Sequence, residues 1–169
     1  MRAARDKRPG PARRFLFRLP LLLERMGAPP LGQMVARLLG IDWIVLETVG
    51  RHTGRPHVVV LDIVGHDRAH DRFYVQPAYG RRADWVRNVT AHPEVTARVG
   101  RQRFRARVRD ATGPEGAAVV LRFVRAHPWY ARLIVYFVGY VDRIDRPDEE
   151  LRRALATTPV LAVEASPPR

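Results

Sequence analysis

Residues 43–64 read WIVLETV-GRHTGRP-HVVVLDIV, and this stretch decides how the chain begins to fold. Residues 43–49 are mostly apolar, β-branched or aromatic, which is typical of a largely buried strand. The polar residues 50–56 follow, and residues 57–64 form a second apolar run of strand length. Two strands around a turn that contains glycines at positions 50 and 54 predict a β-hairpin.

Further strands are predicted to come in hairpins, with helices between the groups. Residues 65–71 predict a turn, and residues 100–102 predict a second one. Residues 104–108 alternate apolar residues with arginine, which predicts a strand with one apolar and one basic face. This order favours an α+β fold with an antiparallel barrel over a parallel doubly wound sheet. The other predicted strands are 72–76, 95–99 and 160–163, and the predicted helices are 82–91, 114–126, 128–140 and 147–156.

Residues 1–30 differ from the rest of the chain and predict a basic N-terminal arm with helical segments. Residues 31–165 then form one barrel domain, as expected for a chain of 169 residues. The apolar stretch 19–23 is too short for the core of a signal peptide. The longest apolar run, residues 133–141, is well short of the roughly 18 residues of a membrane-spanning helix. We therefore expect a cytoplasmic protein.

Composition limits the chemistry that the chain can perform. The sequence holds no cysteine, which excludes disulfides, thiolate catalysis, iron–sulfur centres and cysteine-containing zinc sites. Lys and Arg number 30 against 17 Asp and Glu, so the formal net charge is +13. Such an excess calls for an anionic partner: nucleic acid, an acidic membrane surface or a polyanionic small molecule. Phe15, Phe17 and residues 21–23 adjoin basic residues, which makes the arm a candidate for peripheral contact with an anionic membrane.

The turn 50–56 is the strongest local signal of a binding site. Its two glycines allow backbone amides to approach a ligand, and Arg51, His52, Thr53 and Arg55 offer charged and hydroxyl donors. These features predict an anion site. A solvated basic turn is the equally weighted alternative. Neither a phosphate-binding P-loop nor a dinucleotide-binding glycine motif occurs anywhere in the chain.

Residues 79–88, where a strand ends and a helix begins, are a second candidate. The amides at a helix N-terminus favour phosphate or carboxylate, and arginines in this segment add charge. Tyr79 and Trp85 could flank an aromatic ring system. The slightly favoured alternative makes Trp85 a core anchor and the arginines a solvated face.

Other polar clusters carry weaker signals. Residues 66–71 hold two histidines and two aspartates, but Arg68 lies between them and we expect no metal. His92 and His127 each precede a proline, so helix boundaries explain them. Trp129 and Tyr130 are expected in the core. No arrangement typical of hydrolases is recognisable.

Taken together, these segments resemble the deazaflavin-dependent nitroreductase family of split β-barrel proteins. Residues 46–56 resemble that family's T-x-G-R-[KRH]-[ST]-G-x-P turn, and residues 79–88 its G-x-x-[AS]-D-W-x-x-N segment. The similarity spans about residues 35–163. It implies an antiparallel split barrel of about six strands with flanking helices, and binding of coenzyme F420, a hydroxy-deazaflavin with a phosphate and an oligoglutamate tail.

The resemblance also implies an activity and a set of residues. The activity is hydride transfer from the reduced deazaflavin to a small molecule: a quinone, a nitroaromatic or an activated double bond. The protein would position two flat molecules and help to protonate the product. Tyr130 is implied near the substrate, as the catalytic candidate. The implied coenzyme-binding residues are Gly50, Arg51, His52, Thr53, Gly54, Arg55, Pro56, Gln76, Ala78, Tyr79, Gly80, Arg81, Asp84, Trp85 and Asn88, with Arg82 as an alternative to Arg81.

Two departures from the family pattern leave alternatives open. Many relatives carry lysine where this chain has His52, and a serine and a second glycine where it has residues 76–78. Flavin mononucleotide is therefore the second candidate cofactor, and haem or loss of cofactor binding also remain open. The net charge of +13 makes a non-enzymatic nucleic-acid-binding protein the second candidate class. A homodimer is a further expectation, because split barrels often pair through the sheet.

Overall fold

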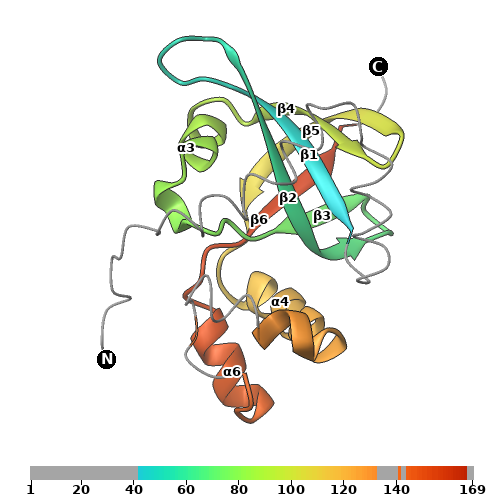
Figure 1. Ribbon diagram of the computed structural model, residues 1–169, viewed down its shortest axis with the longest axis vertical. Coiled ribbons are helices and arrows are strands. Elements are labelled where there is room, and N and C mark those ends of the chain that lie inside the picture. Colours follow the sequence, from blue (N-terminus) through green and yellow to red (C-terminus); the bar gives the residue numbers. More distant parts are fainter. Residues whose placement is uncertain (1–41, 133–140, 142–143, 167–169) are drawn as a thin grey trace.

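The structure is a computed structural model that describes residues 42–132, 141 and 144–166. Its centre is a closed antiparallel barrel of six strands in the order β1-β2-β3-β6-β5-β4, with helices around it (Figure 1). The predicted α+β barrel is therefore confirmed. The strands are β1 (Trp43–Val49), β2 (Pro56–Asp67), β3 (Arg72–Val75), β4 (Glu94–Val99), β5 (Gln102–Asp110) and β6 (Leu161–Ala165), and the helices are η1 (Gly80–Arg82), α3 (Asp84–Ala91), α4 (Pro114–Ala126) and α6 (Asp148–Leu155).

The hairpin predicted from residues 43–64 is formed by β1 and β2. Its register pairs Trp43 with Asp62 and Val49 with Pro56. Along β1 the buried residues alternate with more exposed ones, so Ile44 and Leu46 point into the barrel with no exposed surface. Residues that pair directly across β1 and β2 face the same side of the sheet. Trp43 faces outward, so its partner Asp62 also lies on the outside of the barrel.

Strand β2 is longer than predicted, because it continues through Gly65 to Asp67. The prediction of a turn at 65–71 was wrong in its first half. A β-bulge lies between Ile63 and Gly65. Ile63 packs in the barrel core, whereas its neighbour Val64 packs in the helical core. Gly65 is needed for close packing instead of a turn, since a Cβ there would lie 2.3 Å from the Cγ1 of Val119 in α4.

Two apolar clusters hold the fold together. One fills the barrel and includes residues from α3, which packs beside β1; the other joins α4 and α6 to the outside of the barrel. Figure 1 shows α4 and α6 side by side beneath the barrel and α3 at its left edge. His92 and His127 follow the last residues of α3 and α4, as predicted. Residues 128–132 are helical, and the rest of the helix predicted to 140, like the arm 1–30, falls outside the described residues.

A group of ion pairs ties the start of α4 to the barrel. Arg109 of β5 donates to Glu115 of α4 at 2.6 Å and to Glu164 of β6 at 2.7 Å. The Tyr74 hydroxyl of β3 donates to the same Glu115 carboxylate at 2.8 Å. The hydrogen bond from Arg109 is the main cause that lowers the pKa of Glu115; burial opposes it, and Tyr74 adds to it.

Glu115→Gln should lower the free energy of unfolding by about 1 kcal/mol at pH 7, a modest figure because this group is partly exposed. A carboxyl whose pKa is lowered in the folded state stabilises the protein above its unfolded pKa, and that stability is lost as the pH falls. The difference between variant and wild type should therefore shrink below about pH 4. Urea denaturation at pH 7 and at a pH below about 4 measures this difference in the free energy of unfolding. Glu149→Gln, at the exposed partner of Arg153 in α6, is the control and should cost less than about 0.5 kcal/mol. An equal loss at both pH values for Glu115→Gln would contradict the prediction.

Candidate functional site

The turn between β1 and β2 is held by its own backbone. The Gly50 N–H donates to the Arg55 carbonyl at 2.8 Å, and the Gly54 N–H donates to the Gly50 carbonyl at 2.8 Å. Gly54 has φ +65°, a left-handed conformation that favours glycine. The amides of both glycines are thus used inside the turn. A ligand here would meet the side chains of the turn, not the glycine amides that the sequence suggested.

Arg51 joins this turn to helix α3. Its backbone N–H and its Nη1 donate to Oδ1 of Asn88 at 3.2 and 3.1 Å, and its Nη2 donates to Oδ1 of Asp84 at 3.2 Å. Asn88 is only 4% exposed, whereas the Asp84 side chain is 83% exposed. The two segments singled out in the sequence, 50–56 and 79–88, therefore meet, and the guanidinium of Arg51 is engaged with α3.

The rest of the turn offers donors to solvent. His52, Thr53, Gly54, Arg55 and Pro56 are all exposed. The Thr53 hydroxyl accepts a hydrogen bond from the Arg55 N–H at 3.3 Å. An exposed arginine, histidine and threonine on a turn with fixed backbone form a donor set that suits an anion.

The loop after β3 is fixed at both ends. Gln76 Nε2 donates to the Thr158 hydroxyl at 3.1 Å. Arg81 donates to Oδ2 of Asp110 at 2.5 Å and to the Thr112 hydroxyl at 3.0 Å, so it is paired at the end of β5. Between them Tyr79 is 41% exposed, Ala78 is half-buried, and Gly80 has φ +62°. The structure does not bring Arg81 to the turn 50–56 by any of these contacts.

Trp85 packs against the core, which is the alternative that the sequence slightly favoured for this residue. It is partly buried against the barrel core, next to Val86 and Val89 of the same helix, which are buried. The aromatic side chain that stands more open to solvent in this segment is Tyr79.

Tyr130 has a partner that the sequence did not suggest. Its hydroxyl donates a hydrogen bond to Oδ2 of Asp62 on the outer face of β2. Burial, and then the charge of Asp62, raise the pKa of Tyr130 well above its usual range. Burial also raises the pKa of Asp62, while hydrogen bonds with Tyr130 and Trp43 lower it. In the sequence, Asp62 stands out only as the one carboxylate within the apolar run 57–64.

The prediction that Trp129 lies in the core was wrong. Its side chain is 49% exposed, and its ring meets the Tyr130 ring edge-on at 5.5 Å. In the helix that begins at 128, Trp129 is exposed, whereas the next residue, Tyr130, bonds to Asp62 of β2.

The histidines and aspartates of residues 66–71 pair with one another. His70 Nδ1 lies 2.8 Å from Asp67 Oδ2, and His66 lies 3.7 Å from Asp71 and stacks on Phe73. Within the described ranges, no group of three metal-ligating side chains is close enough to hold an ion.

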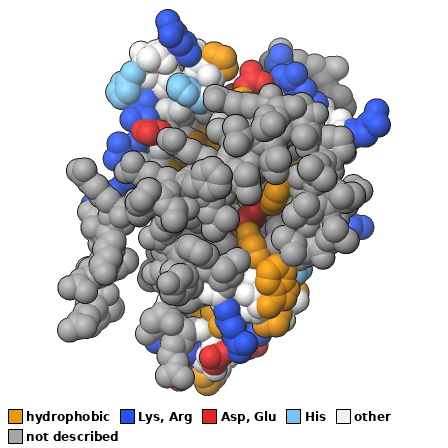
Figure 2. Space-filling view, in the orientation of Figure 1, with side chains coloured by type: hydrophobic (Ala, Val, Ile, Leu, Met, Phe, Trp, Pro, Cys, Tyr) orange, Lys and Arg blue, Asp and Glu red, His pale blue; other side chains and the backbone are white. Residues whose placement is uncertain are grey.

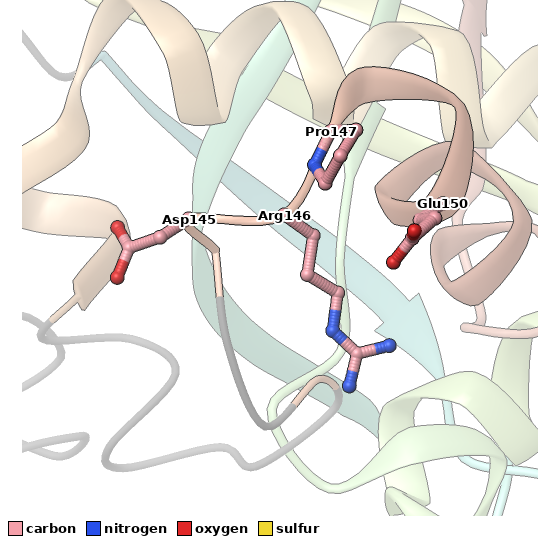
Figure 3. Close-up of a pocket in the computed structure, with 4 residues that line it drawn as sticks. All are labelled: Asp145, Arg146, Pro147 and Glu150. Atoms are coloured by element: carbon pink, nitrogen blue, oxygen red, sulfur yellow. The ribbon is translucent and has the colours of Figure 1, made fainter.

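A surface pocket lies elsewhere, at the start of α6. It has a volume of about 480 Å³ and is lined by Asp145, Arg146, Pro147 and Glu150 (Figure 3). Figure 3 shows the Asp145 and Arg146 side chains pointing to opposite sides. None of these four residues belongs to the predicted site.

Comparison with known proteins decides the family. Residues 24–136 match the family described as F420H(2)-dependent quinone reductase, and this range contains both segments of the site. The chain belongs to the F420H(2)-dependent quinone reductase family. This quinone reductase family member is therefore an oxidoreductase, and its cofactor is coenzyme F420. The resemblance to deazaflavin-dependent reductases in the sequence is confirmed.

The other comparisons are more distant. The chain is similar to a structure titled "Structure of F420-H2 Dependent Reductase (FDR-A)", with 22% identity over 72% of this chain and 93% of that one and a TM-score of 0.49. It is also similar to a structure described as a domain-swapped dimer, with 21% identity over 72% of this chain and 79% of that one and a TM-score of 0.48. No curated protein matches the chain.

Proposed function

We propose that this F420-dependent reductase transfers a hydride to a quinone, and that the turn 50–56 holds the acidic part of the coenzyme. The observation that carries the proposal is the triple contact of Arg51 with Asn88 and Asp84, which fixes an exposed basic turn against α3. A nitroaromatic or an activated double bond is the alternative acceptor.

The donor set of the turn fits the acidic tail of coenzyme F420. His52, Thr53 and Arg55 are exposed and would contact the phosphate or the glutamates, while Arg51 keeps the turn in place through α3. On a fixed backbone, little conformational freedom is lost when an anion binds. We propose that the loop with Gln76, Ala78, Tyr79 and Gly80 lies along the coenzyme ring and its linker. Trp85 would support this loop from the side of the barrel core. Arg81 would remain bonded to Asp110.

The outer face of β2 offers an apolar path away from the turn. Val58 is 46% exposed, and Val60 and Asp62 follow it on the same face. Asp62 lies six positions after Pro56, about 20 Å along the strand. Figure 2 shows exposed apolar side chains in the lower centre of one face, with Lys and Arg side chains spread from its top and sides to positions beside them. A flat apolar ring would bind beside such a strip, with Tyr130 at its far end.

When bound, the reduced deazaflavin supplies the hydride. The residues of the chain bind and orient the two molecules and help to protonate the product. Tyr130 is proposed as the catalytic residue, because its hydroxyl is held at a fixed place on the outer face of the barrel by Asp62.

A titration tests this function. Purified protein is mixed with coenzyme F420 while tryptophan fluorescence is followed, and reduced coenzyme is then offered with the quinone menadione. We expect saturable binding and oxidation of the reduced coenzyme that depends on menadione. Tight binding of flavin mononucleotide with no saturable binding of F420 would overturn the proposal.

His52→Lys should tighten the binding of coenzyme F420 several-fold at pH 8. The lysine ammonium adds a positive charge worth about 1 kcal/mol against an anion some 4 Å away in water. The gain should fall at high salt. His70→Lys makes the same change at an exposed position between β2 and β3 and should leave affinity unchanged. Equal gains for both variants would indicate a general effect of net charge and contradict a site at the turn.

Four expectations about the whole molecule remain proposals. We propose a barrel domain over residues 31–165, a cytoplasmic location, and contact of the basic arm 1–30 with anionic membrane, where an apolar quinone would dissolve. Among the described residues, no helix has the length and apolarity to cross a membrane. A homodimer is also proposed. The closed barrel leaves no unpaired strand edge among the six strands, so such a dimer would form through side chains.

A further inference from the structure

Asp62 is an unusual residue for its place in the fold. It follows Val58, Val59, Val60 and Leu61 in β2, and its register partner is Trp43 of β1. Just beyond it Val64 packs under the helices, so Asp62 lies where the exposed strip of β2 passes beneath the helical layer. Shielding a carboxylate from water costs free energy unless it is paired. An apolar residue at position 62 would be buried in this strand at a lower cost in free energy.

Among the residues that the structure describes, two neutral donors hydrogen-bond to this carboxyl: the Tyr130 hydroxyl and the Trp43 side chain. Burial therefore favours the protonated form of Asp62 and raises its pKa. In the carboxylate form Tyr130 donates its hydrogen to Asp62. In the acid form Asp62 donates instead, and the hydroxyl hydrogen of Tyr130 is released for another acceptor.

We propose that Asp62 and Tyr130 form a two-member proton relay that supplies the proton of the reduced product. The proposal rests on the proposed function, in which a quinone receives a hydride beside Tyr130. The Tyr130 O–H bond breaks as a bond forms between that proton and the quinone oxygen. At the same time the Asp62 O–H bond breaks and its proton restores the Tyr130 hydroxyl. The quinone gains one hydride and one proton, and solvent returns a proton to Asp62.

The aromatic neighbours of the pair supply a way to observe it. Trp129 meets Tyr130 edge-on at 5.5 Å, and Trp43 is paired with Asp62 across the two strands. A quinone that binds near Tyr130 should quench the fluorescence of these tryptophans, even in protein that holds no coenzyme. Binding can therefore be measured apart from turnover.

The test compares Asp62→Asn, Tyr130→Phe and the double variant with the wild type. Asparagine keeps an oxygen that can accept from Tyr130 but holds no transferable proton. We expect each single variant to lower kcat at least tenfold, within the range of general acid catalysis. The double variant should be no slower than the slower single one, since both remove the same relay. Asp62→Glu should recover part of the lost kcat.

Two further measurements separate a relay from a structural role. Menadione titrated into coenzyme-free Asp62→Asn should bind within about twofold of the wild type, and urea denaturation should show no loss of stability. Asp71→Asn, at an exposed carboxyl in the turn before β3, is the matched control and should leave kcat unchanged. An unchanged kcat in Asp62→Asn, losses that multiply in the double variant, or a parallel loss of menadione binding would each overturn the relay. A wild type that shows no menadione reduction with reduced F420 would instead overturn the proposed function, and the relay with it.

Discussion

Asn88→Ala should weaken the binding of coenzyme F420 by at least about tenfold, which corresponds to about 1.4 kcal/mol. Asn88 is buried, and its Oδ1 accepts two hydrogen bonds from Arg51, one from the backbone and one from the side chain. Alanine leaves the backbone N–H of Arg51 without its acceptor in a partly buried place, which costs about 1–3 kcal/mol. The turn 50–56 then loses its fixed position beside α3. Fluorescence titration and urea denaturation measure the two effects.

Asp84→Asn is the control for this variant. Asp84 contacts the same arginine at 3.2 Å, but its side chain is 83% exposed, and exposed ion pairs contribute less than about 1 kcal/mol. We expect its coenzyme affinity to stay within about threefold of the wild type. If Asn88→Ala bound the coenzyme as tightly as the wild type, the turn would not be the binding element, and the proposed placement of the coenzyme would be wrong.

Gly116→Ala should be the most destabilising single substitution considered, with a loss of about 3 kcal/mol. Gly116 lies in the first turns of α4, where alanine would normally be preferred by about 1 kcal/mol. Here its Cβ would lie 2.5 Å from the carbonyl oxygen of Ala111 and 2.8 Å from the Cβ of Val160. The carbonyl belongs to the backbone and also accepts the Gly116 N–H at 2.9 Å, so it cannot move without loss of that bond.

Gly65→Ala provides the comparison. Its Cβ would meet a side-chain atom, Cγ1 of Val119, at 2.3 Å. The second substitution Val119→Ala removes that atom and should restore part of the stability lost in Gly65→Ala. For Gly116→Ala, the substitution Val160→Ala should restore little, because the contacts with the Ala111 carbonyl and with the Cβ of residue 160 both remain. Thermal unfolding of the four variants distinguishes the cases, and full recovery in the Gly116→Ala, Val160→Ala protein would contradict this account.

Strand periodicity and turn chemistry were sufficient to predict most of the barrel. The apolar runs on both sides of the turn at 50–56 predicted the β1–β2 hairpin, and the arginine alternation in β5 predicted its outward basic face, where Arg103, Arg105 and Arg107 are exposed. Gly65 misled the interpretation because a glycine can serve a turn or a close contact. Only the position of α4 over β2, which depends on packing between distant segments, shows which of the two applies.

The candidate site was predictable as two segments but not as an arrangement. The donors of the turn and the start of α3 were named from the sequence, yet nothing in their spacing indicated that Arg51 would bond to Asn88 across 37 positions. Asp62 was missed because a single carboxylate in an apolar strand carries no motif. Trp129 was misplaced because helical periodicity over so short a segment does not fix which of two adjacent aromatic residues faces inward.

The place of β6 has a consequence for how the protein is made. This strand comes last along the chain, yet it lies between β3 and β5 and pairs with both. While the ribosome is still adding the residues before 161, those two strands have no neighbour on one side, and unpaired strands of this kind attract other chains. Completion of the barrel must therefore wait until synthesis has passed residue 165. A nascent chain stalled before that point should depend on chaperones to stay out of aggregates.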